Sequence, residues 1–272
     1  MYEKMVFLLL FTAIILNLLT MIKSYLNYCI NSTKVSKVNY PFIKKLHLSV
    51  FSKLQEINDR EIQNYIRTLK ANKLRLKVTD LGAGSKKTNS TERSIESIVK
   101  SASITPRFGK LLHVLINEFK SKTVLELGTS LGVGTSYLAL GNSTQVYTIE
   151  GCPRISEFTQ SQLKHLSNVN FYVGEFSTQL NKVLIQSGPP DLVYVDGNHT
   201  YEATLDYFQF CIENASSTAI LVFDDIHWSS GMERAWKELI QSKEVSISID
   251  LFRMGIVFLD KRLDKTDVVL RF

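Results

Sequence analysis

Cysteine is scarce in this sequence, and no pattern of cysteines suggests a structural role. The three cysteines, Cys29, Cys152 and Cys211, form no C-x-x-C pair in 272 residues. The spacing therefore gives no indication of a disulfide framework or of a zinc site, which favours a reducing compartment.

Most of the chain lacks an excess of basic residues over acidic ones, although the formal net charge of the whole chain is +6. From Lys23 to Ser90 there are 14 Lys and Arg against 4 Asp and Glu, whereas from Thr91 onwards there are 17 against 21. Because the larger part lacks a basic surface, no nucleic-acid partner is expected. The basic segment is open to two interpretations: a region near anionic phospholipid, or a solvated helical face.

Charge is absent from Met5 to Ile22, which reads MVFLLLFTAIILNLLTMI. As a helix this run would extend about 27 Å, close to the roughly 30 Å of a hydrocarbon core. No small-x-small cleavage site follows, and lysines lie almost entirely after the run. We therefore predict a retained membrane anchor with the rest of the chain on the cytoplasmic face. The alternatives are a helix buried against the domain and an upstream extension that is never translated.

Apolar runs and amphipathic segments alternate through the C-terminal two thirds. Strands are expected at 123–127, 145–149, 169–173, 191–195, 219–223, 245–250 and 254–259, the last two as a hairpin. Helices are expected at about 131–140, 155–166, 176–187 and 201–215, with another around Trp236. This alternation predicts an α/β fold with a seven-stranded, mostly parallel sheet, one antiparallel strand and helices on both faces.

The N-terminal third shows a different pattern. Two helical patterns lie between Pro41 and Lys73, a short strand is expected at 74–78, and the polar run 86–93 is expected to be a loop. Thr105-Pro106 is typical of a helix start. The predicted division is an anchor at 1–22, a basic helical region at 23–93, and a main domain at 94–272.

Two acid-and-glycine turns compete for a ligand-binding role, Asp80-Leu-Gly-Ala-Gly and Glu126-Leu-Gly-Thr-Ser-Leu-Gly. A cofactor turn needs a strand before it, a helix after it, and a second strand that ends in an acid about 20 residues later. The first turn fails the last two requirements. The second meets all three, since the strand Gln145–Glu150 ends in an acid. Its G-x-x-x-G-x-G spacing differs from that of dinucleotide binders, which counts against NAD.

Five stretches together resemble a known family: ITPRFGKLLHVLI, VLELGTSLGVGTSYLAL, VYTIEG, DLVYVDGNHTYEATLDYF and ILVFDDIHW. They resemble class I S-adenosylmethionine-dependent methyltransferases, in the O-methyltransferase branch of the catechol, caffeoyl-CoA and macrocin type. The resemblance runs from Ser94 to Phe272 and implies a Rossmann-like sheet. The residues before Ser94 resemble a bacterial subfamily of the kind found in Bacteroidetes.

The resemblance implies a set of cofactor-binding positions. The glycine turn would lie against the methionine half of S-adenosylmethionine, the acid after the second strand would bind the ribose, and later positions would flank the adenine. The implied residues are Glu126, Gly128, Ser130, Gly132, Glu150, Cys152, Glu175, Phe176 and Asp196.

Carboxylates also follow the next two strands, as Asp196-Gly-Asn-His199 and Asp224-Asp225-Ile-His227. Carboxylates that converge repel one another unless a cation or protons neutralise them. The metal-dependent relatives hold Mg²⁺ with Asp, Asp and Asn, which implies Asp196, Asp224 and Asp225 here, with one extra charge at the third position. The alternative is that Asp196 contacts only the cofactor and Asp225 caps a turn.

The implied function is methyl transfer from S-adenosylmethionine to an oxygen of a small-molecule acceptor, with Mg²⁺ and a homodimer left open. Candidate catalytic residues are His199 and His227 as general bases, together with Asp196. Gly82 and Gly84 then read as hinges of a lid loop, or as a plain turn. The rivals are an NAD-dependent oxidoreductase and a non-catalytic, membrane-tethered cofactor-binding protein.

Overall fold

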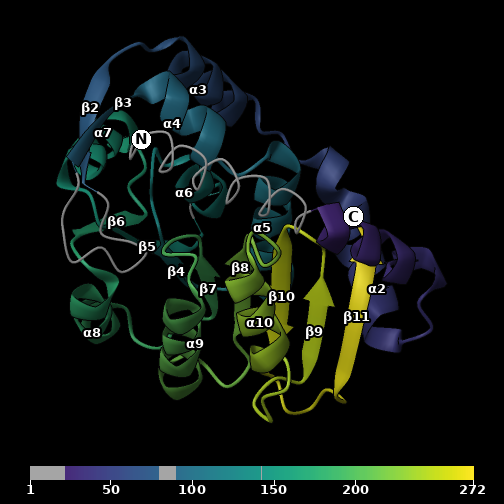
Figure 1. The fold of residues 1–272 in the computed structure, drawn as a ribbon. Coiled ribbons are helices and arrows are strands. Elements are labelled where there is room, and N and C mark those ends of the chain that lie inside the picture. The colour runs from purple at the N-terminus through teal and green to yellow at the C-terminus, as the bar shows by residue number, and fades with distance from the viewer. Residues whose placement is uncertain (1–21, 80–89, 142) are drawn as a thin grey trace, which may run out of the picture.

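One large sheet with helices on both sides organises the chain (Figure 1). The computed structural model describes residues 22–79, 90–141 and 143–272. Within these ranges the sheet has nine strands in the order β1-β11-β9-β10-β8-β7-β4-β5-β6. Its strands are β1 (Thr33–Lys34), β4 (Thr123–Leu127), β5 (Gln145–Glu150), β6 (Val169–Val173), β7 (Leu192–Val195), β8 (Ile220–Asp224), β9 (Ile247–Asp250), β10 (Met254–Phe258) and β11 (Thr266–Arg271).

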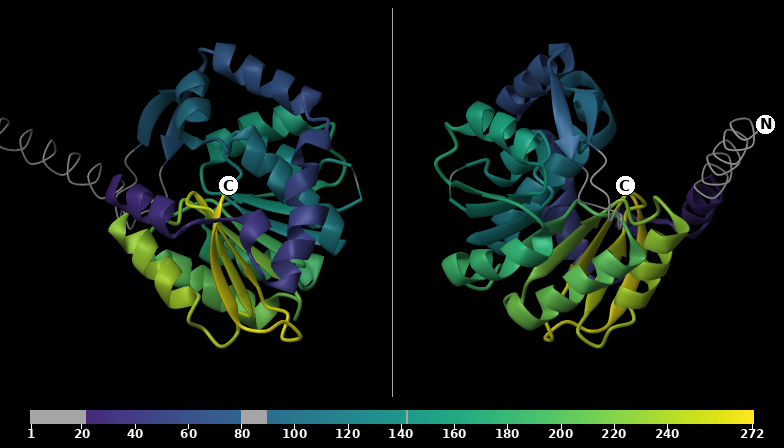
Figure 2. Two further views of the ribbon diagram at one scale, coloured as in Figure 1. Left: turned by 90° about the vertical axis from the view of Figure 1, so that its right-hand side faces the viewer. Right: turned by 60° about the vertical axis from the view of Figure 1, so that its left-hand side comes forward.

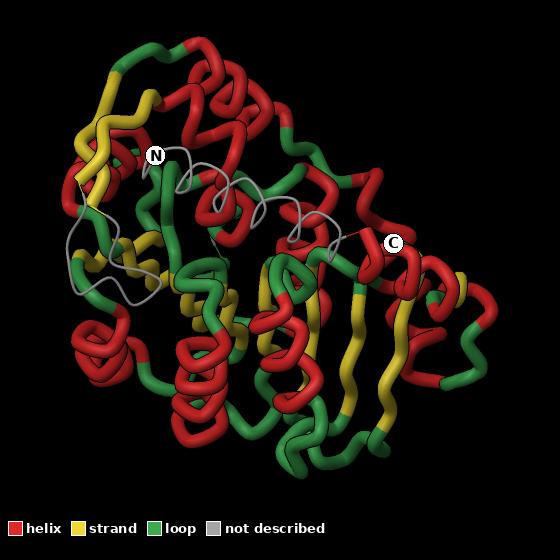
Figure 3. The backbone as a smooth tube through the Cα atoms, in the orientation of Figure 1, coloured by secondary structure: helices red, strands yellow, loops and turns green. Residues whose placement is uncertain are grey.

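Helices lie on both sides of the sheet (Figure 3). Each face of the sheet has its own apolar core, because the buried strands carry apolar residues on both sides. Leu180, Phe208 and Trp236 mark the helices of one face, which are α8 (Phe176–Ser187), α9 (Tyr201–Asn214) and α10 (Ser230–Leu239). The helices that contribute to the other core are α2 (Pro41–Ser49), α3 (Arg60–Ala71), α4 (Ile95–Ala102), α5 (Pro106–Phe119), α6 (Val133–Leu138) and α7 (Pro153–Leu163).

The predicted α/β fold is confirmed, including the single antiparallel strand. Strand β10 runs antiparallel to both β8 and β9, whereas the other neighbouring pairs are parallel. The predicted strand number of seven is wrong. Strand β11 adds to the edge beyond β9, with Val268 opposite Ile249, and the two-residue β1 pairs with β11.

The N-terminal extension is folded onto the main domain and shares its core. Ile43 and Ile62 are buried in the same cluster as Leu111 and Leu115 of α5. Strands β2 (Arg75–Thr79) and β3 (Ser90–Ser94) form an antiparallel hairpin above α7, and the 3-10 helices are η1 (Val35–Lys37) and η2 (Phe51–Glu56) (Figure 2). The loop predicted for 86–93 is therefore wrong over residues 90–93. Gly82 and Gly84, the predicted hinges, lie outside the described residues.

The predicted anchor, residues 5–22, also lies outside the described residues except for Ile22. Of the helices that the structure describes, none is both long enough and apolar enough to cross a bilayer. Residues 22–31 are helical and pack beside the C-terminal edge of the sheet (Figure 2). The Tyr28 hydroxyl donates to the Leu270 carbonyl at 2.5 Å, and the Tyr25 ring meets the Phe252 ring edge-on at 5.1 Å.

Gly255 in β10 gives a test of this packing. A Cβ added there would lie 2.5 Å from the ring of Trp236, which is buried between α10 and the sheet. We expect Gly255→Ala to lower the free energy of unfolding by about 1–3 kcal/mol, because a buried indole cannot move aside. Urea denaturation measures this change.

The matched control is Gly231→Ala in α10. The nearest atom to a Cβ there is at 3.6 Å, an ordinary contact. This variant should match or slightly exceed the stability of the wild type, because alanine favours a helix over glycine. Equal destabilisation by both substitutions would contradict the packing described for Trp236.

Candidate active site

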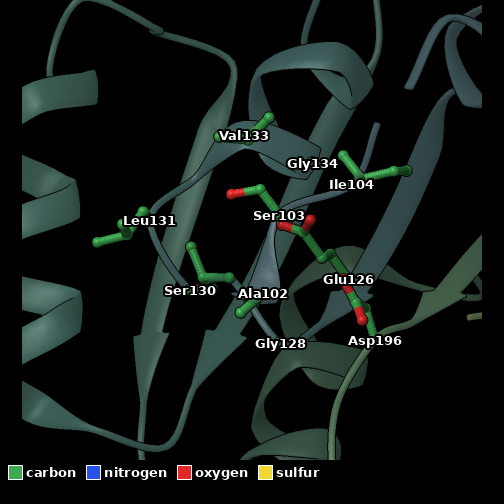
Figure 4. Close-up of a pocket in the computed structure, with 11 residues that line it drawn as sticks. Ala102, Ser103, Ile104, Glu126, Gly128, Ser130, Leu131, Val133, Gly134 and Asp196 are labelled. Carbon is green, nitrogen blue, oxygen red and sulfur yellow. The ribbon is translucent and has the colours of Figure 1, made fainter. Parts of the chain in front are cut away.

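A small pocket lies at the carboxyl ends of β4 and β7, where the second glycine turn crosses the sheet edge (Figure 4). The turn supplies one wall and the linker between α4 and α5 supplies another. The lining residues are Ala102, Ser103, Ile104, Glu126, Gly128, Thr129, Ser130, Leu131, Val133, Gly134 and Asp196. Four predicted residues, Glu126, Gly128, Ser130 and Asp196, are thus brought together. The linker residues Ser103 and Ile104 are not among the predicted site residues, although the stretch ITPRFGK begins at Ile104.

The glycine turn needs its glycines because it presses against the end of β7. Gly128 has φ +109°, and a Cβ there would lie 2.1 Å from the carbonyl oxygen of Asp196. Gly132 has φ +74° and precedes α6, with Leu163 and Thr159 too close for a Cβ. The turn is therefore fixed both in conformation and in position against its neighbours.

Glu126 is a buried carboxylate with one unsatisfied oxygen. Its Oε2 accepts hydrogen bonds from the hydroxyls of Thr135 and Thr148, both at 2.6 Å. No described residue gives Oε1 a hydrogen bond. Burial raises the pKa of Glu126 to about 7, since the charged form loses its hydration. A cationic group in the pocket would satisfy Oε1.

Glu150 lies at the end of β5, beside the same turn. Its Oε2 accepts from the backbone N–H of Ser130 and its Oε1 from that of Cys152, both at 2.8 Å. Burial raises the pKa of Glu150, and these hydrogen bonds oppose the rise. Each carboxylate oxygen keeps acceptor capacity, so the group is oriented to receive a pair of hydroxyls.

The remaining predicted cofactor residues surround this centre. Cys152 is buried, and its Sγ lies 3.3 Å from the backbone nitrogen of Thr79 in β2. Glu175 is exposed and precedes α8. The Phe176 ring packs against Gly197, the residue after Asp196. A Cβ added to Gly197 would lie 2.9 Å from that ring.

Arg253 neutralises much of the acidic cluster that follows β7 and β8. Its Nε donates to Asp224 Oδ1 at 3.1 Å and its Nη2 to Asp224 Oδ2 at 2.9 Å. Its Nε also lies 3.7 Å from Asp225 Oδ1. The Tyr194 hydroxyl lies between Asp196 and Asp224, at 3.0 and 3.3 Å from their Oδ2 atoms.

The predicted Mg²⁺ set, Asp196, Asp224 and Asp225, does not fit a resident divalent ion in this arrangement. Both oxygens of the fully buried Asp224 already accept from a guanidinium, so an ion would have to displace a cation. In the part of the chain that the structure describes, no three His, Cys, Asp or Glu side chains are grouped to hold a metal. Burial and the neighbouring Asp224 raise the pKa of both Asp196 and Asp225.

The two candidate bases have different surroundings. His199 Nε2 lies 3.6 Å from Asp196 Oδ1, and its side chain is 26% exposed. His227 has Nδ1 3.1 Å from Glu233 Oε1 and Nε2 2.8 Å from Asp250 Oδ2. These two carboxylates outweigh burial and raise the pKa of His227. An imidazolium held at both nitrogens cannot accept a proton, so the geometry opposes His227 as a base and favours His199.

Sequence reasoning missed Arg253 and Tyr194. The predicted hairpin places Arg253 in the turn before its second strand, but the pairing partner of that strand is seen only in the fold. Because β10 pairs with β8 in the register Met254 opposite Asp224, the residue before Met254 must reach the cluster. Tyr194 lies within an apolar strand and reads as core, and it is indeed fully buried.

The sequence has relatives among known proteins. Residues 125–226 match the family model described as a methyltransferase domain. The chain is 30% identical over 134 residues to a catechol O-methyltransferase of Mycobacterium tuberculosis, covering 47% of this chain and 59% of that protein. It is 25% identical over 142 residues to one of Niastella koreensis, covering 50% and 63%. The chain thus spans about three fifths of each relative.

Solved structures share the fold. An O-methyltransferase from Bacillus cereus in complex with S-adenosylhomocysteine has a TM-score of 0.52 at 18% identity, over 59% of this chain and 84% of that one. The O-methyltransferase TomG from Streptomyces achromogenes, in complex with S-adenosylmethionine, has a TM-score of 0.50 at 22% identity, over 58% and 82%. The family match and the relatives bear out the resemblance to S-adenosylmethionine-dependent methyltransferases, with residues 125–226 matching a methyltransferase domain. The solved structures show that the fold is shared.

Proposed function

We propose that this protein transfers a methyl group from S-adenosylmethionine to an oxygen of a small-molecule acceptor. The observation that carries the proposal is a pair of acids on adjacent strands around one glycine turn, the buried Glu126 and the partly buried Glu150. Both rival functions lack support, since the matching family model and the relatives named above are methyltransferases.

The described residues fit this cofactor. Glu150, held by two backbone N–H groups, suits the ribose hydroxyls. The unsatisfied Oε1 of Glu126 suits the cationic methionine end, and Asp196 lines the same pocket. Cys152 and Phe176 flank the adenine side in this proposal. When bound, the cofactor supplies an electrophilic methyl on a sulfonium.

His199 is the proposed base. The acceptor hydroxyl gives its proton to the imidazole, oriented by Asp196 at 3.6 Å, as an oxygen lone pair forms the new bond to the methyl carbon. The bound cofactor would supply the methyl group and would keep the electron pair of the broken carbon–sulfur bond as a neutral thioether. We propose a phenolic acceptor, with catechol as the first probe because the relatives are catechol O-methyltransferases. This scheme gives Mg²⁺ no step.

Glu150→Gln tests the ribose assignment. The amide nitrogen of glutamine takes the place of one of the two oxygens that accept from backbone N–H groups, and the remaining neutral oxygen is a weaker acceptor for the ribose. We expect S-adenosylmethionine affinity to fall by about 1–3 kcal/mol, measured by calorimetry. Glu157→Gln on α7, an exposed ion-pair partner of Arg154, is the control and should bind normally. Unchanged affinity in a folded Glu150 variant would disprove the assignment.

Glu126→Gln tests the buried acid through the pH dependence of stability. Because the folded pKa of about 7 lies above the usual 4.5, the protonated form is favoured in the fold. The contribution of Glu126 to the free energy of unfolding is fully present below about pH 4.5. It is lost as the pH rises to about 7, because the unfolded chain releases the proton more readily than the folded one. The variant should therefore gain relative to the wild type at pH 8 by at most about 3 kcal/mol. Urea denaturation without cofactor at pH 4.5 and pH 8 measures this, and equal differences at both pH values would contradict it.

We also propose that the chain attaches to the cytoplasmic face of a membrane through residues 5–22. Support from described residues comes from the helix that continues the run, where Ile22, Leu26 and Ile30 are exposed at 49, 55 and 80%. Exposed apolar side chains on one helix, next to a basic segment, suit the interface of an anionic bilayer.

Deletion of residues 1–22 tests the attachment. The full chain should fractionate with membranes of its native cells, and the deleted chain should be soluble and still bind S-adenosylmethionine. Calorimetry on the deleted chain is the control for folding. Full-length protein found wholly in the soluble fraction would contradict the attachment.

A further inference from the structure

The acidic cluster contains its own cation. We propose that Arg253 does the work that a divalent ion would otherwise do at this site, so that methyl transfer needs no metal. The inference rests on the proposed function, since it concerns how the acceptor side of that site is charged. Its basis is the placement of the guanidinium on Asp224 and Asp225.

The two acids leave little room for a second cation. Asp224 is 0% exposed, and each of its oxygens faces an Arg253 nitrogen at 2.9 to 3.3 Å. This is a forked, charge-assisted pair, the strongest kind of hydrogen-bonded contact between side chains. A divalent ion at Asp224 would meet a fixed positive charge on the same carboxylate. A guanidinium is always charged in proteins, so Arg253 keeps its positive charge beside Asp224 and Asp225 at every working pH.

The turn before β10 is built to hold Arg253 in place. Phe252 has φ +70°, and its N–H donates to Asp250 Oδ1 at 2.7 Å. The Arg253 carbonyl accepts from the N–H of Ile226, which follows Asp225, at 3.2 Å. Asp250 also binds His227, whose ring stacks on Phe252 at 5.2 Å. The backbone on both sides of the ion pair is therefore tied together.

One edge of the guanidinium remains for a ligand. The Arg253 side chain is 29% exposed, and among the described residues Nη1 has no hydrogen-bond partner. A donor with a full positive charge lowers the pKa of a hydroxyl whose oxygen it binds. Arg253 would thus favour loss of the acceptor proton to His199, which is the effect usually supplied by a metal.

The first experiment measures the melting temperature of the full chain with Mg²⁺ at increasing concentration and with EDTA. An ion that binds only the folded state raises the melting temperature by mass action. We expect the wild type to be unaffected by either addition. We expect Arg253→Met to melt lower and to gain stabilisation by Mg²⁺, because the freed carboxylates then need a cation. Arg262→Met removes an exposed partner of Asp260 and is the matched control.

A wild type stabilised by Mg²⁺ in a saturable way, with Asp224→Asn abolishing the effect, would overturn the proposal. If Arg253→Met does not fold, Arg253→Lys keeps the charge without the fork. With catechol as the probe, we expect Arg253→Lys to lower kcat roughly tenfold with S-adenosylmethionine affinity unchanged. EDTA-treated wild type should keep its catechol activity. Calorimetry measures S-adenosylmethionine binding by the wild type as a separate experiment. If the wild type does not bind S-adenosylmethionine, the proposed function is refuted rather than the role of Arg253.

Discussion

The burial of several carboxylates at one edge of a sheet is the constraint on which this site depends. Glu126 and Asp224 are 1% and 0% exposed, and Asp196 lies between their strands. Each acid is compensated differently: Glu126 by two hydroxyls and a raised pKa, Asp196 by Tyr194, and Asp224 by Arg253. Among the described residues, Oε1 of Glu126 at the glycine turn and Nη1 of Arg253 have no hydrogen-bond partner. The site is therefore polarised before any ligand enters.

The sequence predicted the central strands well because their apolar runs are buried on both faces. Strand β4 begins and ends at the predicted residues. Strand β6 also has its predicted bounds, although it lies at the edge of the sheet and is only partly buried. Strand β11 was missed, since Thr266–Arg271 has only Leu270 fully buried and lies near the edge. The glycine turn and Glu150 could be found from spacing, because their contacts are local to adjacent strands. Arg253 could not, since its partner Asp224 is 29 residues away and the pairing register decides the contact. The prediction of His227 as a base could not be corrected from the sequence, because only the fold brings Glu233 and Asp250 to its two ring nitrogens.

The N-terminal extension directly contacts the glycine turn that follows β4. The Tyr65 hydroxyl of α3 donates to the carbonyl of Leu131, within the turn, at 2.8 Å. Gln63 and Asp59 both bind the hydroxyl of Tyr137 in α6. The turn is thus supported on one side by the end of β7 and on the other by residues that precede the domain match.

These contacts decide where the chain can be cut. A fragment that starts at Ser94, where the family resemblance begins, would lose Tyr65. It would also lose Thr79, whose backbone N–H contacts the Sγ of Cys152. It would also remove Ile43 and Leu46 from the apolar core that they share with α5. Such a fragment would carry all the proposed cofactor-binding residues and still lack the segments that contact the glycine turn. The smallest autonomous unit of this protein is therefore larger than its recognisable family domain.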